Sequence, residues 1–156
     1  MQPAPEMDAR DRRILRLLQE NGRLTNADLA EKVNLSPSAC LRRVRQLEDS
    51  GVIERYAALL SRDVLHQDGT AIIFMRMERQ NPDIFRAFEE AVHEIPEVME
   101  CYLMAGEADY MLKVVYTDAK DFERIYVGSL LRLPGVAGTQ SHLALRRVYS
   151  SPTLPI

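Results

Sequence analysis

The stretch that decides the fold is LSPSACLRRVRQLEDSGVIERY, residues 35–56. It opens with the chemistry of a helix start: Ser36 is suited to cap the N-terminus, and Pro37 fits the first helical position. It closes on Ser50-Gly51, a pair typical of a helix end. Apolar residues recur between these ends at helical spacing, so the stretch predicts one helix with one buried face.

The predicted helix has two unlike faces. Cys40, Val44 and Leu47 share the inner face, because residues four and seven positions apart meet on one side of a helix. At about 100° per residue the remaining polar residues turn outward. The outward row is Ser38, Arg42, Arg45 and Asp49, and Arg43 lies at its flank. Such a row is either a solvated surface or a surface that meets a phosphate backbone and base edges.

Two shorter helices are predicted before this one. The first is capped by Asp8 and ends at Gly22, and the second is capped by Thr25. Three helices with a brief turn before the last form a helix-turn-helix, whose third helix enters the major groove of DNA with its N-terminal residues first. This context favours the DNA interpretation of the outward row.

Each polar residue of the row then has an expected partner. Ser38 and Arg42 are placed for base edges, where arginine suits guanine. Phosphates are expected to meet Arg43, Arg45 and the helix N-terminus, which comprises Ser36, Pro37 and Ser38.

The pattern changes after an extended connector that follows Gly51. Alternating and β-branched apolar segments predict strands, and apolar residues at helical spacing predict helices. The strands cover residues 70–78, 98–105, 109–116 and 136–149, and the helices cover 82–95 and 118–133. The order βαββαβ is that of a ferredoxin-like fold. The expected class is α+β, with a winged-type helix-turn-helix in residues 1–53, a linker and pairing strand in 54–69, and the ferredoxin-like domain in 70–156.

Charge is divided unevenly between these parts. The 156 residues carry a net charge of −3, of which residues 1–60 contribute +1 and residues 61–156 contribute −4. The acidic second part argues against a protein that coats DNA along its whole surface. The apolar run Tyr56–Leu60 is too exposed for the connector of a monomer, so we expect it to pair with another chain as an extra strand.

Cellular location is expected to be cytoplasmic, in association with the nucleoid. No apolar run approaches the roughly 20 residues that span a bilayer, and residues 1–13 contain no secretory signal. The two cysteines, Cys40 and Cys101, lie within apolar patterns and are expected to be buried and reduced, as is usual in the cytosol.

Enzymatic chemistry finds little support in the sequence. The histidines are scattered and form no metal-ligand spacing with the cysteines, and no glycine-rich phosphate loop is present. We therefore expect no catalytic residues, no metal and no cofactor.

The chain resembles the Lrp/AsnC family, also called feast/famine regulators, over nearly its whole length. Residues 35–56 match the helix-turn-helix phrase of the family, and GEADYMLKV (106–114) matches its hairpin phrase. The segments PEV (96–98) and LPGV (133–136) match its strand starts. The resemblance implies a transcription regulator with an amino-acid-binding second domain, which pairs sheet to sheet into homodimers that often assemble into octamers.

The resemblance also implies where the effector binds. The family builds its pocket largely from the hairpin turn and the start of the last strand, which here correspond to Gly106, Glu107, Ala108, Asp109, Tyr110, Thr139, Gln140 and Ser141. An amino acid needs an anion for its ammonium group, which Asp109 or Glu107 can supply, and N–H or hydroxyl donors for its carboxylate. Asp109 is open to a second interpretation, as a residue that satisfies the turn.

The expected function is therefore an amino-acid-responsive, sequence-specific DNA-binding regulator of an amino-acid metabolism operon. The alternative is an architectural protein that wraps DNA without an effector. An effector that changes assembly or DNA affinity distinguishes the two.

Overall fold

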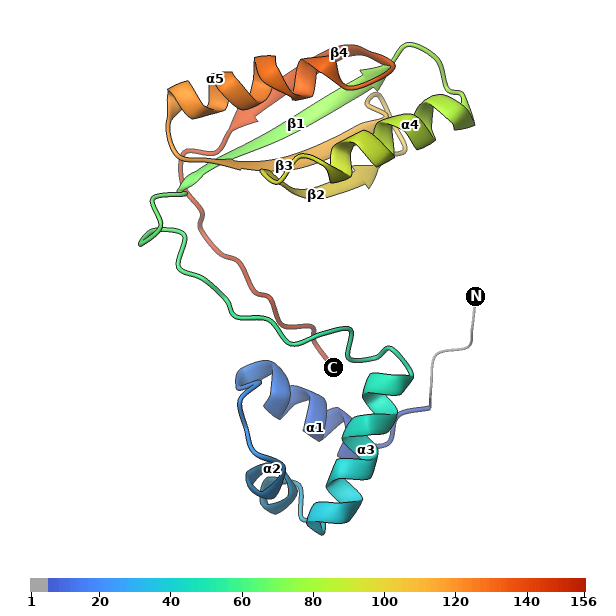
Figure 1. Ribbon diagram of the computed structural model, residues 1–156, viewed down its shortest axis with the longest axis vertical. Coiled ribbons are helices and arrows are strands. Elements are labelled where there is room, and N and C mark those ends of the chain that lie inside the picture. The colour runs from blue at the N-terminus through green and yellow to red at the C-terminus, as the bar shows by residue number, and fades with distance from the viewer. Residues whose placement is uncertain (1–5) are drawn as a thin grey trace. The chain divides into compact units, whose positions relative to one another are not determined.

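The computed structural model describes residues 6–156. Residues 1–5, which begin both the predicted DNA-binding domain and the segment expected to lack a secretory signal, lie outside the described residues. The chain divides into two compact units (Figure 1). One extends to Leu59 and also includes Ser150–Ile156, and the other covers Leu60–Tyr149. Among the described residues, no helix has the length and apolar character that crossing a membrane requires.

The first unit contains three helices: α1 (Ala9–Glu20), α2 (Asn26–Lys32) and α3 (Pro37–Asp49). All three predicted caps are confirmed, because the side chains of Asp8, Thr25 and Ser36 accept hydrogen bonds from backbone N–H groups of the following turn. Such bonds satisfy donors that a helix start otherwise leaves without partners. The helix-turn-helix is thereby confirmed.

The core of the first unit is small and entirely apolar. It consists of Ile14, Leu15, Leu29, Ala30, Val33, Cys40 and Leu47. Ile14 and Cys40 are fully buried, and burial raises the pKa of the Cys40 thiol. The predicted inner face of α3 therefore packs as expected, with Val44 partly buried beside Cys40 and Leu47.

The second unit has the predicted order βαββαβ. Its elements are β1 (Gly69–Met77), α4 (Pro82–His93), β2 (Val98–Leu103), β3 (Tyr110–Tyr116), α5 (Ala119–Gly128), the 3-10 turn η1 (Leu130–Arg132) and β4 (Val136–Leu143). The strands form one antiparallel sheet in the order β2-β3-β1-β4. The ferredoxin-like class is confirmed.

Both long helices of this unit cover the same face of the sheet (Figure 1). Phe88 of α4 and Ile125 of α5 are fully buried against Ile73, Met75 and their neighbours in β1. Alternate residues of β1 point to the opposite face, because successive side chains of a strand alternate. That second face, with half-buried Phe74 and exposed Arg76, is not covered by any element of the second unit.

Two predicted elements end five or six residues earlier than expected, and the other four end within two residues of the expected position. The predicted helix 118–133 stops at Gly128, since glycine disfavours helix interiors, and continues only as η1. The predicted strand 136–149 stops at Leu143, which pairs with Ala71 near the beginning of β1. Beyond Ala144, whose N–H donates to Thr70, the neighbouring strand supplies no further partners.

The expectation that Cys101 is buried is wrong. Cys101 is exposed, whereas Cys40 is buried, and both thiols are free. The reason is topological: β2 lies at the edge of the sheet, so its side chains have neighbours on one side only.

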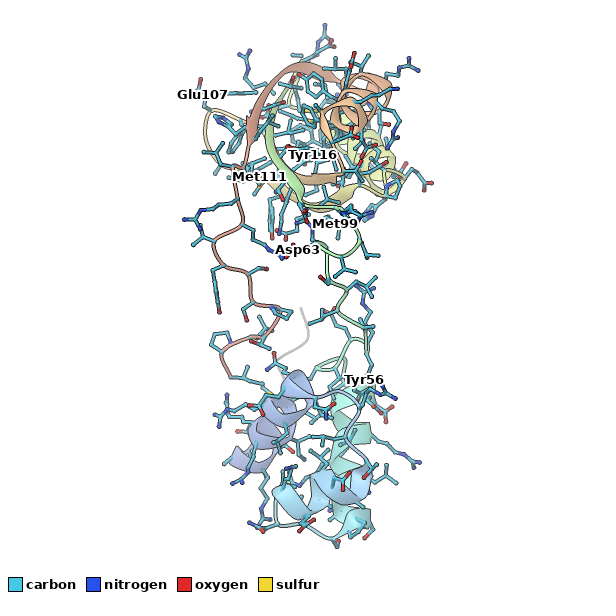
Figure 2. All side chains as sticks on the ribbon, turned by 90° about the vertical axis from the view of Figure 1, so that its left-hand side faces the viewer. Tyr56, Asp63, Met99, Glu107, Met111 and Tyr116 are labelled. Carbon is cyan, nitrogen blue, oxygen red and sulfur yellow. The ribbon has the colours of Figure 1, made fainter. Side chains whose placement is uncertain are left out.

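The connector between α3 and β1 has no regular strand. Tyr56 lies where the chain leaves α3 (Figure 2), and its hydroxyl donates to Glu48. Burial, followed by this bond to a carboxylate, raises the pKa of Tyr56 to about 12. Leu59 and Leu60 are 74% and 71% exposed, which agrees with the expected exposure of this apolar run.

Candidate functional sites

The outward row of α3 is exposed as predicted. Ser38, Arg42 and Arg45 are all exposed on the side away from buried Cys40 and Leu47. Within residues 6–156, Arg42 and Arg45 have no ion pair or side-chain hydrogen bond. The helix thus presents two guanidinium groups whose five donors each remain available to an anion or a base edge.

The start of α3 adds backbone donors to this surface. The Ser36 hydroxyl accepts from the N–H of Ala39 at 3.3 Å and lies 3.3 Å from the Ser38 hydroxyl. Pro37 has no N–H and occupies the first helical position. The partial positive charge of a helix N-terminus favours an anion such as phosphate at this end.

Arg43 occupies a different environment from Arg42 and Arg45. Its guanidinium Nη1 lies 2.9 Å from a carboxylate oxygen of Asp8 and 2.8 Å from one of Asp11, and its side chain is only 23% exposed. The hydrogen bond with Asp11 is the main cause that raises the pKa of Arg43. These two ion pairs join α3 to the beginning of α1. Arg43 therefore fixes the orientation of α3, the helix that carries Arg42 and Arg45.

A pocket of about 520 Å³ lies at one end of the uncovered face of the sheet. It is lined by the β2–β3 turn and by facing positions of β1 and β4, which are paired so that Phe74 lies opposite Gln140 and Arg76 opposite Gly138. Five predicted effector residues line it: Gly106, Glu107, Ala108, Thr139 and Gln140. Glu107 lies in the turn itself (Figure 2).

Arg76 brings a positive charge to this pocket. Its side chain is exposed, makes no ion pair within the described part of the chain, and lies over Gly138, where an added Cβ would come within 3.1 Å of the guanidinium Nη2. Glycine at this position leaves room for the arginine. The pocket therefore holds a cation from β1 and, at Glu107, an anion from the turn, which are the two charges that complement a zwitterion.

The other three predicted effector residues do not line this pocket. Asp109 has its carboxylate committed within the fold, since it accepts from the backbone N–H of Met77 at 2.7 Å and from the side-chain amide of Gln80 at 3.1 Å. Tyr110 points to the helix-covered face and is 1% exposed. Ser141 is exposed and lines neither pocket.

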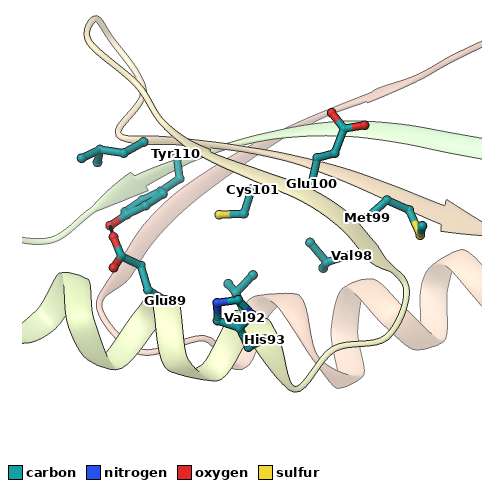
Figure 3. A pocket seen from close by; sticks show the side chains of 9 residues that line it. Glu89, Val92, His93, Val98, Met99, Glu100, Cys101 and Tyr110 are labelled. Atoms are coloured by element: carbon teal, nitrogen blue, oxygen red, sulfur yellow. Dashed lines mark hydrogen bonds between the residues drawn. The ribbon is translucent and has the colours of Figure 1, made fainter. Parts of the chain in front are cut away.

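Tyr110 lines a second pocket, of about 350 Å³, between α4 and β2 (Figure 3). Its hydroxyl donates to Glu89 at 2.7 Å, and its ring packs against Phe88. Burial, then the bond to Glu89, raises the pKa of Tyr110. Cys101 lies in the same pocket, and although the residue is exposed overall, partial desolvation of the thiol and the charge of Glu89 raise its pKa. A raised pKa keeps a thiol protonated, and a protonated thiol is a poor nucleophile.

Arg76, Phe74 and His142 were not predicted as site residues. Their register puts them around the first pocket, because Ile72 pairs with His142 and Phe74 with Gln140. A signal was present: Arg76 is the one charged residue in the strand segment TAIIFMRM. Among residues 6–156, no group of three His, Cys, Asp or Glu side chains is placed to hold a metal ion.

Comparison with known families agrees with this division into two units. Residues 7–54 match the family model described as winged helix-turn-helix DNA-binding, and residues 70–154 match the Lrp/AsnC ligand binding domain. The chain is 38% identical to the leucine-responsive regulatory protein of Klebsiella pneumoniae over 154 residues, which are 99% of this chain and 94% of that protein.

Two solved structures are similar over almost the whole chain. One is a transcriptional regulator from Neisseria meningitidis in complex with L-methionine, at 41% identity and a TM-score of 0.89, covering 96% of this chain and 97% of that one. The other is an AsnC family transcriptional regulator from Agrobacterium tumefaciens, at 36% identity and a TM-score of 0.91, with the same coverage of both chains.

Proposed function

This chain belongs to the Lrp/AsnC family of transcriptional regulators, and from that premise we propose that it reads a specific DNA sequence with α3 and changes its DNA binding when a free amino acid binds the second unit. The observation that supports this most directly is the outer face of α3, where Arg42 and Arg45 are exposed and have no ion-pair partner among residues 6–156. The target is an operon of amino-acid metabolism, and the chain acts in the cytoplasm on the nucleoid.

The division of labour on α3 follows from the environments of its arginines. Ser38 and Arg42 reach base edges, while Arg45 and the helix start at Ser36 and Pro37 contact phosphates. Arg43 is reassigned from a phosphate contact to a positioning residue, because Asp8 and Asp11 already neutralise it. An arginine that chooses a guanine by two hydrogen bonds contributes about 1–3 kcal/mol of discrimination.

The amino acid is proposed to bind in the pocket between the β2–β3 turn and β4. Arg76 takes the carboxylate of the ligand, and Glu107 takes its ammonium group. The relatives support this class of ligand, since one is named leucine-responsive and another was solved with L-methionine. Asp109 stabilises the pocket indirectly, because its carboxylate accepts the Met77 N–H and so fixes the end of β1.

A thermal-shift screen with the twenty amino acids tests the ligand assignment. A ligand at 100 times its Kd stabilises the folded protein by about 2.7 kcal/mol. We expect at least one amino acid to raise the Tm of the wild-type chain and to lose that effect in Arg76→Gln. Arg79→Gln, which removes the same charge three residues away and outside the pocket, is the control and retains the shift. A shift that Arg76→Gln leaves intact contradicts the assignment.

Homo-oligomerisation is the third part of the proposal. The uncovered sheet face, on which half-buried Phe74 lies near exposed Arg76, and the exposed apolar Leu59 and Leu60 are surfaces that a second copy of the chain covers, first as a dimer and then as an octamer. Light scattering at micromolar concentration is expected to report at least a dimer. A monomer at that concentration refutes this part, and the DNA-reading assignment is tested separately.

A further inference from the structure

The last seven residues, Ser150–Ile156, belong structurally to the first unit although the second unit precedes them in the chain. The segment lies along α1, where Gln19 binds the backbone of Leu154 twice. The Gln19 side-chain amide donates to the Leu154 carbonyl at 3.2 Å and its oxygen accepts the Leu154 N–H at 2.6 Å. Nearby, Arg16 donates to a backbone oxygen of Ile156 at 2.5 Å.

Ile156 adds an apolar anchor to these hydrogen bonds. Its side chain is partly buried and packs against the core of the first unit, the cluster that contains Ile14 and Cys40. The residues before the docked segment are unlike it: Leu145 is 102% exposed and Tyr149 is 82% exposed. The residues between β4 and the docked segment are therefore mostly exposed, and their one ion pair within the described residues joins Arg147 to Asp63 of the connector at 3.8 Å.

The contacts also show what α1 recognises. Gln19 pairs with both backbone groups of Leu154, whose side chain remains 73% exposed, so that position is bound without regard to its side chain. Selectivity comes from the position two residues later, where the side chain of Ile156 reaches the core. This surface fits an extended peptide that ends its contact with a branched aliphatic residue.

We propose that Ser150–Ile156 is a strap, a second covalent connection that restrains the DNA-reading unit relative to the effector unit. The linker is the first connection, and the fifteen residues between Ile53 and Gly69 reach about 50 Å when extended. The ten residues between Leu143 and Leu154 reach only about 35 Å. While the strap is docked on α1, the shorter connection sets the limit of motion.

Through the strap, a change in the second unit can alter the restraint on the first unit without involving the linker. β4 lines the proposed ligand pocket, and the strap continues directly from its end. Release of the strap lets the linker alone restrain the DNA-reading unit. This inference concerns the docking of the segment on α1 and does not depend on the identity of the amino acid.

Limited proteolysis of the full chain tests the strap, with cleavage followed by mass spectrometry within the docked segment Ser150–Ile156. Ile156→Asp removes the anchor and is expected to raise the cleavage rate about tenfold, because cleavage follows the population of the open form. Leu145→Asp makes the same chemical change at an exposed position and leaves the rate within twofold of wild type. Equal rates in both variants overturn the proposal.

A second variant and readout separate restraint from simple loss of stability. Gln19→Ala removes two hydrogen bonds from the helix surface and leaves the core intact. We expect it to raise the same cleavage rate severalfold and to broaden the distance distribution between spin labels at Ser38 and Lys120, while hydrogen exchange in α2 and α3 stays as in wild type. If cleavage becomes faster but the distance distribution stays unchanged, the segment docks on α1 without restraining the first unit, and the proposal is overturned.

Discussion

The outer face of α3 and the pocket at the β2–β3 turn are assembled in opposite ways. The face comes from thirteen consecutive residues, so helical spacing alone decides that Arg42 and Arg45 point outward together. The pocket gathers residues from β1, β4 and the β2–β3 turn, and Arg76 reaches Gly138 only through the register of β1 with β4. A surface of the first kind depends on the stability of one small unit, and a site of the second kind depends on strand pairing.

The largest expected effect is a loss of stability that stays within one unit when a side chain of that unit's core is truncated. Leu47→Ala removes a 5% exposed side chain from the small core under α3 and is expected to cost about 2–5 kcal/mol. Urea unfolding followed by hydrogen exchange then shows α1–α3 opening early and DNA binding lost, while ligand binding persists. Leu112→Ala in the second core gives the reverse pattern. If both variants destabilise both units equally, the chain is one cooperative body and the comparison fails.

The next effect concerns the DNA-reading face alone. Arg42→Ala is expected to weaken binding to the chain's own promoter fragment by about 10- to 100-fold, the equivalent of 1–3 kcal/mol. Arg86→Ala removes the same charge from an exposed position on α4 and serves as control. Binding is measured by fluorescence anisotropy at fixed salt, because ionic strength alone changes such affinities. Equal losses in the two variants indicate a general charge effect and no specific contact.

Asp109 and Glu107 are expected to contribute differently to stability and to ligand binding. Asp109→Ala leaves the Met77 N–H without its partner and is expected to destabilise the second unit by about 1–3 kcal/mol. Glu107→Ala, two residues away in the exposed turn, is expected to change stability by less than about 0.5 kcal/mol and to weaken ligand binding. Urea unfolding and ligand titration distinguish them. A stability loss in Glu107→Ala that equals that of Asp109→Ala contradicts the division.

The smallest effect is the response of the first unit to acid. Backbone N–H groups, chiefly that of Asp11, together with Arg43 lower the pKa of Asp8 below its usual value of about 3.9. A carboxylate with a lowered pKa in the folded state stabilises above its unfolded pKa, and that contribution is lost as pH falls through the folded pKa. Unfolding of α1–α3 is expected to become easier below about pH 4. Asp8→Asn is expected to weaken this dependence, and an unchanged pH profile contradicts it.

Local chemistry could be predicted from the sequence, and distant pairing could not. The caps Asp8, Thr25 and Ser36 act within four residues of themselves, and their assignments are confirmed. Arg43 was expected to face DNA because spacing puts it near the outer row. Its partners Asp8 and Asp11 lie more than thirty residues earlier, and only the packing of α3 on α1 brings them together.

In the second unit, too, local features could be predicted from the sequence and contacts between distant residues could not. The hairpin turn was predicted from its residues, but the direction of Asp109 and Tyr110 depends on which face of the sheet each strand position takes. Arg76 lies about thirty residues from the turn, and the strap lies 135 residues from Gln19. Neither relation appears in any local pattern, so both required the folded chain.

The central claim, that an amino acid controls DNA binding, is tested most directly by titrating the full chain onto its promoter fragment in the presence and absence of each of the twenty amino acids. At least one amino acid is expected to change the apparent Kd by roughly 5- to 150-fold, which is the usual range of coupling between two sites. The same amino acid is expected to have no effect on DNA binding by Arg76→Gln. If none of the twenty changes DNA affinity or assembly, the chain is a DNA-wrapping protein without an effector, and the claim is contradicted.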